Sequence, residues 1–308
     1  MPIPPMTGPP GGRPAPESDR LGQCLARTLP IGVFDSGVGG LTVMKALAAR
    51  LPGEDLLYLG DTARVPYGAR SGQTVQRYAH RVAGHLFRRG IKALVVACNT
   101  ATTWALPSLQ AVGGRLGLPV LGVIEPGVAR ALSLTQNGVV GVIGTEGTVR
   151  GGAYTAALLR ERPSVQVRSA ACPLFVALAE EGWNEGEIAE LSAERYLASL
   201  RGGPDTLILG CTHYPLLTAA IAKALPGVQL VDAAGATADA TAALLAARGA
   251  LRDASSGGQL RYLVTDHVER FEAIGARFFG QPLGGVELVD LGDEDGAAFD
   301  ERGLGATP

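Results

Sequence analysis

Two cysteines, Cys98 and Cys211, stand at predicted strand-to-helix turns, where catalytic residues are often found. Cys98 follows the apolar residues 94–97, Cys211 follows the apolar residues 207–210, and hydroxyl or amide side chains that favour helix N-caps come next. At such a strand-to-helix turn, free backbone N–H groups and the helix dipole stabilise a thiolate and can also hold a carboxylate. The repeated pattern indicates a pair of reactive thiols. The plain alternative is two small buried side chains.

Several polar residues could support these thiols. Asp35 and Ser36 end the first apolar run, and an aspartate there could face a cationic ammonium group. His213 lies two residues beyond Cys211 and could poise that thiol as an acid or hold its charged form. Either Glu180 or Glu181, which follow an apolar run, could reach the same site or face solvent.

Signatures of cofactors are weak in this chain. The glycine-rich residues 37–40 lack the spacing of the nucleotide fingerprints and have no Walker lysine. Cys211 with His213 alone is too little for zinc, and no second ligand stands near Cys98 at a suitable spacing. A pyridoxal cofactor needs a lysine in its site, and none of the three lysines is well placed: Lys45, Lys92 and Lys223. We expect neither a metal nor an organic cofactor.

Composition excludes several classes of protein. The 308 residues carry 27 basic and 29 acidic side chains with no basic block, which argues against nucleic acid or an anionic membrane as partner. No apolar run reaches the roughly 20 residues of a membrane helix. Four cysteines are too few for a disulfide scaffold and indicate a reducing compartment. Residues 1–28 are rich in Pro and Gly without an apolar signal region, so we expect a flexible tail on a cytoplasmic globular protein.

Strand-like and helix-like runs alternate after this tail. Continuous apolar strands separated by helices predict the α/β class, with parallel sheets covered on both faces. The expected strands are residues 31–34, 56–59, 93–97, 120–124, 139–143, 165–169, 206–209 and 228–231. The expected helices are residues 41–50, 74–89, 151–161, 185–200, 215–224 and 237–247.

An internal echo divides the chain into two similar halves. The segments around the two cysteines resemble each other at a separation of 113 residues, and residues 31–37 resemble residues 140–145. Two facing halves would place equivalent strand ends on opposite walls of one cleft. We therefore expect two pseudo-symmetric, doubly wound domains with the active site in the cleft between them. The first comprises residues 29–123 plus 233–280, the second residues 124–232, and the Gly- and Asp-rich residues 281–308 form a second tail.

Four segments together resemble the glutamate racemase family. They are residues 35–40 (DSGVGG), 61–68 (DTARVPYG), 97–102 (ACNTAT) and 210–215 (GCTHYP), and the resemblance spans about residues 31–280. It implies a cofactor-independent isomerase that interconverts L- and D-glutamate in the cytoplasm. Such an enzyme supplies D-glutamate for peptidoglycan, and so serves cell wall biogenesis and cell shape.

The resemblance also implies roles for individual residues. One cysteine thiolate removes the α-proton and the opposite thiol returns a proton to the other face, with Cys98 acting on D-glutamate and Cys211 on L-glutamate. Asp35 and His213 would assist their respective cysteines, and Glu180 would assist the Cys211 side. The substrate would be held by residues on both sides of the cleft: Asp35, Ser36, Tyr67, Gly68, Asn99, Thr100, Thr212 and His213.

Three other interpretations remain at this stage. An aspartate racemase or another two-cysteine racemase would share the thiol pair. A small-molecule binding protein built from two α/β lobes would carry the cysteines as buried side chains, and a nucleotide-binding enzyme comes third. Members of such families associate in different ways, and a homodimer is one form that the resemblance allows.

Overall fold

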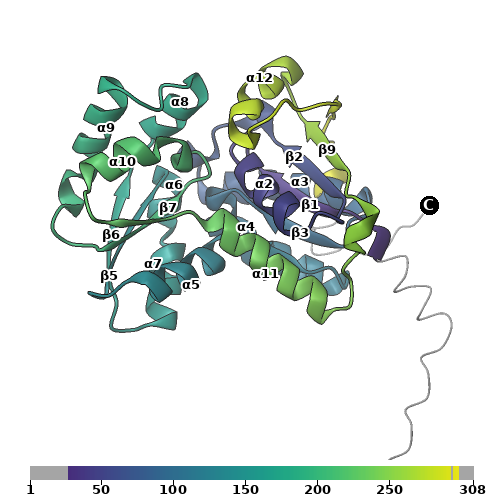
Figure 1. Ribbon diagram of the computed structural model, residues 1–308. Coiled ribbons are helices and arrows are strands. Elements are labelled where there is room, and N and C mark those ends of the chain that lie inside the picture. Colours follow the sequence, from purple (N-terminus) through teal and green to yellow (C-terminus); the bar gives the residue numbers. More distant parts are fainter. Residues whose placement is uncertain (1–26, 293, 298–308) are drawn as a thin grey trace, which may run out of the picture.

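The computed structural model describes residues 27–292 and 294–297, which fold into two domains, each built on one all-parallel sheet (Figure 1). Of the expected tails, residues 1–28 and 281–308, the parts at residues 1–26, 293 and 298–308 lie outside these described residues. Arg27 belongs to the folded part, because its side chain donates a hydrogen bond to the Gly249 carbonyl and its own carbonyl accepts one from Lys92.

The first domain contains a six-stranded sheet in the order β10-β9-β2-β1-β3-β4. Every residue of its central strands is buried, because helices cover both faces. Alternate residues of β1 belong to different cores: Val33 packs in the core that holds α2, α11 and α12, and Phe34 packs in the core that holds α3 and α4. The strands are β1 (Ile31–Asp35), β2 (Leu56–Gly60), β3 (Ala93–Val96), β4 (Val120–Gly122), β9 (Leu260–Val264) and β10 (Val286–Leu288). The helices are α2 (Leu41–Arg50), α3 (Gly72–Arg88), α4 (Asn99–Arg115), α11 (Ala233–Ala247), α12 (Val268–Phe279) and α13 (Glu294–Ala297).

The second domain contains a four-stranded sheet in the order β6-β5-β7-β8. On one face, Val142 and Ile208 pack against α5 and α7, and on the other Leu207 and Leu209 share a core with α8, α9 and α10. The strands are β5 (Val139–Gly144), β6 (Gln166–Ala171), β7 (Thr206–Gly210) and β8 (Gln229–Val231). The helices are α5 (Ile124–Leu134), α6 (Glu146–Gly151), α7 (Ala153–Glu161), α8 (Leu174–Glu181), α9 (Glu187–Leu197) and α10 (Thr218–Ala224).

The two sheets share one topology. The order β2-β1-β3-β4 in the first domain is the order β6-β5-β7-β8 in the second, so that β3 corresponds to β7. Cys98 comes two residues after β3 and Cys211 directly after β7, and the two thiols therefore occupy equivalent strand ends. The predicted fold, two parallel α/β domains related by an internal echo, is confirmed.

Short 3-10 turns link some of these elements. Two of them, η1 (Thr62–Arg64) and η2 (Tyr67–Ala69), form the loop between β2 and α3, and a third, η4 (Tyr214–Leu217), precedes α10. The others are η3 (Ala198–Leu200) and η5 (Ala254–Ser256).

The structure differs from the sequence expectations near the C-terminus. Strand β9 was not among the expected strands, and β10 pairs with it where a loose tail was expected from residue 281. Leu283, Val289 and Leu291 are buried against the first domain. These apolar side chains stand among Gly and Asp residues, and packing them on an otherwise open sheet edge removes them from water.

Candidate active site

Cys98 occupies the turn between β3 and α4, as its sequence context predicts. It is the N-cap residue of α4, and its sulfur accepts a hydrogen bond from the Ala101 backbone N–H at 3.4 Å. The thiol donates to the Ser36 hydroxyl at 3.6 Å. The side chain is buried, with 5% of its surface exposed, so the thiol is shielded from bulk water.

The charge state of Cys98 differs from the sequence expectation of a stabilised thiolate. Burial, and then the negative charge of Asp35, raise the pKa of Cys98 to about 12, against the smaller opposing effects of the Ala101 N–H and the Ser36 hydroxyl. Desolvation disfavours a buried anion more than one helix N-terminus favours it. These surroundings therefore favour the neutral thiol form of Cys98 at physiological pH.

Cys211 lies in a different local setting. The chain after β7 enters the 3-10 turn η4 and reaches α10 only at Thr218, so no α-helix begins at this thiol and the helix-dipole expectation is wrong here. Instead, the Nδ1 atom of His213 lies 3.8 Å from the Cys211 sulfur, and its Nε2 atom lies 3.2 Å from Glu180 Oε1. The second thiol is thus paired with an imidazole that a carboxylate holds in place.

His213 carries a positive charge in this arrangement. Burial alone would lower its pKa, but the hydrogen bonds with Cys211 and Glu180, and then negative charge on Cys211 and Asp35, outweigh burial and raise the pKa to about 10. The hydrogen bond from His213 is also the main reason that the pKa of Glu180 is lowered. Glu181 is exposed and lies 3.9 Å from Arg270, so Glu180 is the member of the pair that reaches His213, the partner of the Cys211 thiol.

Asp35 ends β1 beside the first thiol and is almost fully buried. Its Oδ2 atom accepts a hydrogen bond from the Gly37 N–H at 2.9 Å, whereas its Oδ1 atom is buried without a hydrogen-bond partner. Burial raises the pKa of Asp35 and the nearby positive charge of His213 opposes that effect. A buried carboxylate oxygen without a partner is a natural acceptor for a cationic ligand group.

Hydrogen bonds join the two domains directly around the cysteines. The Thr100 hydroxyl lies 2.9 Å from the Thr145 hydroxyl and 3.1 Å from the Thr148 hydroxyl, and all three are buried. Tyr154 of α7 donates to Asn99 Oδ1 at 2.6 Å. The sequence interpretation did not single out these second-domain residues. The similarity between residues 31–37 and 140–145 is the signal that could have found Thr145, since Thr145 aligns with Ser36 when the two segments are superimposed.

The remaining predicted site residues lie at the same boundary. Gly68 packs on Thr145, where an added Cβ would come within 2.6 Å of the threonine Cβ, so only glycine fits without a shift. Thr212 is buried with its hydroxyl 3.5 Å from His213 Nδ1. Tyr67 is buried too, but its hydroxyl donates to Asp61 Oδ2 at 2.6 Å and is therefore already engaged.

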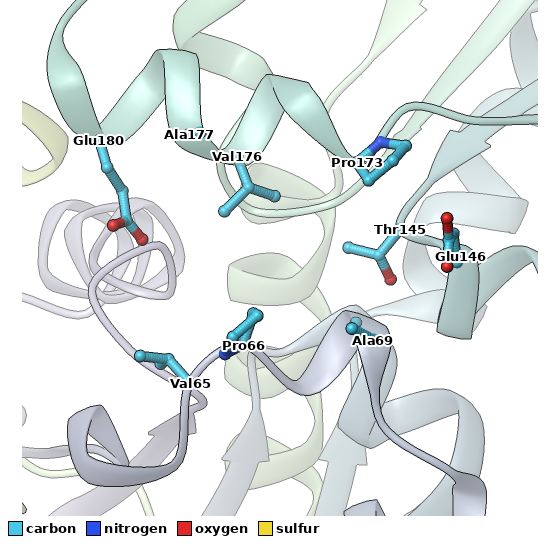
Figure 2. Close-up of a pocket in the computed structure, with 10 residues that line it drawn as sticks. Val65, Pro66, Ala69, Thr145, Glu146, Pro173, Val176, Ala177 and Glu180 are labelled. Atoms are coloured by element: carbon cyan, nitrogen blue, oxygen red, sulfur yellow. The ribbon is translucent and has the colours of Figure 1, made fainter.

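A cavity of about 360 Å³ opens between the domains beside these residues (Figure 2). In Figure 2, Val176 and Glu180 extend from α8 on one side, and Val65 and Pro66 face them from the loop on the other. Neither cysteine lines it, but Glu180 connects it to His213 and Thr145 connects it to Thr100. Its lining consists of Val65, Pro66, Gly68, Ala69, Thr145, Glu146, Pro173, Val176, Ala177 and Glu180.

Two further properties of the described part of the chain bear on other functions. Within residues 27–292 and 294–297, no cluster of three or more His, Cys, Asp or Glu side chains could hold a metal ion. Within the same residues, no helix combines the length and apolar character needed to cross a membrane.

Comparisons with known proteins identify the family. The model of the Asp/Glu/hydantoin racemase family matches residues 31–241. A glutamate racemase of Geobacter metallireducens is 53% identical over 263 residues, which cover 85% of this chain and 96% of the relative. The solved glutamate racemase of Francisella tularensis, in complex with D-glutamate, superposes with a TM-score of 0.81 at 38% identity, covering 86% of this chain and 98% of that one. The glutamate racemase of Thermus thermophilus, in complex with β-chloro-D-alanine, gives 0.78 at 46% identity with the same coverages.

The chain belongs to the Asp/Glu/hydantoin racemase family and is an isomerase, an amino-acid racemase. Within that family it is a member of the glutamate racemases. The fold, two all-parallel α/β domains, agrees with this assignment.

Proposed function

We propose that this enzyme interconverts L- and D-glutamate with two cysteines as acid and base on opposite faces of the substrate. The observation that carries the proposal is the meeting of two equivalent strand ends, each bearing a thiol, at one buried boundary. Besides burial and Asp35, a charge on Cys211 also raises the pKa of Cys98, so the two sulfurs are close enough to interact electrostatically.

On the second-domain side, Cys211 removes the α-proton of L-glutamate. The His213 imidazolium beside the sulfur stabilises the thiolate, and the Glu180 carboxylate holds the imidazolium in position. The α C–H bond breaks, its electron pair stays on the α-carbon, and the proton moves to the Cys211 sulfur. The Cys98 thiol then gives its proton to the opposite face, which yields D-glutamate and a Cys98 thiolate.

On the first-domain side, the substrate changes the charge balance. Its ammonium group would meet the unpartnered Oδ1 atom of Asp35 and offset the negative charge that raises the pKa of Cys98. The raised pKa of Cys98 is therefore compatible with a thiolate once the ammonium group is bound, when Cys98 acts on D-glutamate. The ammonium group of D-glutamate itself thus lowers the pKa of Cys98 and makes the thiolate base available.

The carboxylates and the developing carbanion require fixed donors. Hydroxyl and amide groups beside both thiols supply such donors, and the N-terminal turn of α4 adds backbone N–H groups. The candidate donors are Ser36, Asn99, Thr100 and Thr212, with Tyr67 and Gly68 shaping the loop over the site. Burial of the cysteines keeps water away from the reacting centre.

The deciding experiment for this function is chiral chromatography of L-glutamate incubated with protein that has been dialysed against a chelator. D-glutamate should form without pyridoxal phosphate or a divalent metal, and L-aspartate should remain unchanged. Racemisation of aspartate but not glutamate would favour the aspartate racemase alternative. Dependence on an added cofactor would contradict the cofactor-free mechanism.

We further propose that the enzyme works in the cytoplasm and supplies D-glutamate for peptidoglycan, and so for cell wall biogenesis and cell shape, as a homodimer. This role follows from the kind of enzyme it is. Expression of the chain in a bacterium that depends on added D-glutamate should remove that dependence, and light scattering should give twice the mass of one chain. Continued dependence, or a monomer mass, would contradict the respective part.

A further inference from the structure

Tyr154 bridges the two halves of the site. It lies on α7 of the second domain, is 2% exposed, and donates its hydroxyl proton to Asn99 Oδ1 at 2.6 Å across the domain boundary. Asn99 is the residue directly after Cys98 and the first residue of α4. The acceptor of this short hydrogen bond is therefore part of the turn that carries the first thiol.

The other side of the Tyr154 ring contacts the turn that carries the second thiol. Gly210 ends β7 directly before Cys211, and a Cβ added to it would lie only 3.0 Å from Tyr154 Cε2. The ring thus packs on the Gly210 backbone, where a larger residue would displace it. The buried Tyr154 side chain therefore contacts Gly210, which precedes Cys211, and Asn99, which follows Cys98.

The hydrogen bond also has a consequence for the amide of Asn99. An asparagine side chain has one carbonyl oxygen and one NH₂ group with two donors. With the oxygen held by the Tyr154 hydroxyl, rotation of the amide is restricted and the NH₂ group stays available for an acceptor. A substrate carboxylate is such an acceptor.

We propose that Tyr154 is a positioning residue that acts through Asn99. It fixes the amide so that its N–H donors face the substrate carboxylate, and its contact with Gly210 sets that orientation relative to the Cys211 side. The Asn99 amide is held in this orientation only when the two domains are in contact, because its hydrogen bond with Tyr154 crosses the boundary between them. This inference rests on the proposed function, because it assumes a carboxylate substrate between the cysteines.

The test is a double-mutant cycle on racemisation of L- and D-glutamate. Tyr154→Phe keeps the ring on Gly210 and removes only the donor to Asn99, so kcat/KM should fall about tenfold in both directions, mainly through a higher KM. Asn99→Ala should cost at least as much. The double variant should be no slower than Asn99→Ala, because Tyr154 acts through the group that is already gone.

Tyr196→Phe is the matched control. It removes a tyrosine hydroxyl from the same domain, one that accepts a hydrogen bond from the Leu174 N–H and has no part in the proposed mechanism, and should leave kcat and KM within twofold of the wild-type values. Additive losses in the double variant, or wild-type kinetics in Tyr154→Phe, would overturn the inference. Because wild-type racemisation is measured in the same series, either result is distinguishable from failure of the proposed function, which would show no racemisation in any variant.

Discussion

The two domains share one strand order but surround their cysteines differently. In the first domain the thiol caps a long helix, donates to Ser36 and lies in the field of Asp35. In the second, the thiol has no α-helix beginning at it and is paired with His213 and Glu180. The shared topology brings the sulfurs to equivalent places, whereas side chains from neighbouring elements, Asp35 at the end of β1 and Glu180 on α8, make the two surroundings different.

A second difference concerns the strand next to the central one. Strand β2 is buried because β9 and β10 extend the sheet beyond it, whereas its counterpart β6 is an edge strand with exposed polar residues. The added strands also support the loop over the site. Thr265, directly after β9, donates to Asp61 Oδ1 at 3.0 Å, and Asp61 in turn accepts from the Tyr67 hydroxyl. The first-domain side of the site is therefore supported by more strands than the second-domain side, and by these hydrogen bonds.

The largest expected effect comes from removing either thiol. Both Cys98→Ser and Cys211→Ser should lower racemisation at least about 1,000-fold in both directions, because a serine hydroxyl cannot supply a thiolate at neutral pH. Chiral chromatography measures the residual rate, and Cys172→Ser, at a buried cysteine that carries no role in this mechanism, is the control. Racemisation that survives in either variant would mean that one base serves both faces.

A smaller effect is expected at the imidazole that distinguishes the second thiol. His213→Asn should lower kcat about 100-fold, within the usual range for a residue that assists proton transfer. His267→Asn, at a histidine that is mostly exposed, is the control for the same chemical change and should keep wild-type rates. An unchanged kcat in His213→Asn would show that the second thiol needs no partner, and the contrast between the domains would lose its chemical meaning.

The pairing of His213 with Glu180 also predicts a pH-dependent contribution to stability. The pKa of the histidine is raised to about 10 in the folded protein from an ordinary value of 6.5, so its stabilising effect is complete below about pH 6.5 and is lost as pH rises through about 10. The urea midpoint of the wild type should exceed that of Glu180→Gln at pH 7, and this gap should narrow at pH 10.5. A gap that does not depend on pH would contradict the charged pair.

The smallest effect is expected from truncation of residues 1–26. A chain that begins at Arg27 keeps the hydrogen bonds of that residue with Gly249 and Lys92, so racemisation should stay close to the full-length rate. The comparison requires only kcat and KM of both forms. A loss greater than about tenfold, or about 1.4 kcal/mol of activation free energy, would show that the segment contributes to the site.

The sequence predicted the features that depend on local pattern. The continuous apolar strands and the repeated turn context are local signals, and they predicted Cys98 and Cys211 at equivalent strand ends. Strand β10 was missed because its short apolar run stands among Gly and Asp, and its stability comes from pairing with β9.

The features that depend on contact between the domains could not be predicted. The raised pKa of Cys98 arises from burial, and burial is a property of the assembled boundary. The bond between Tyr154 and Asn99 joins residues 55 positions apart on different domains, with no local signal in either segment. Sequence reasoning could therefore place the two thiols but not the raised pKa of Cys98.

The most direct test of the two-base account uses the enantiomers of β-chloroglutamate. After one cysteine removes the α-proton, the electron pair forms a double bond between the α- and β-carbons and chloride leaves, so no second acid is needed. Cys211→Ser should keep chloride release from the D-like analogue through Cys98, and Cys98→Ser should keep it from the L-like analogue through Cys211. Chloride release lost equally from both enantiomers in both variants, or kept for the same enantiomer in both, would contradict the account.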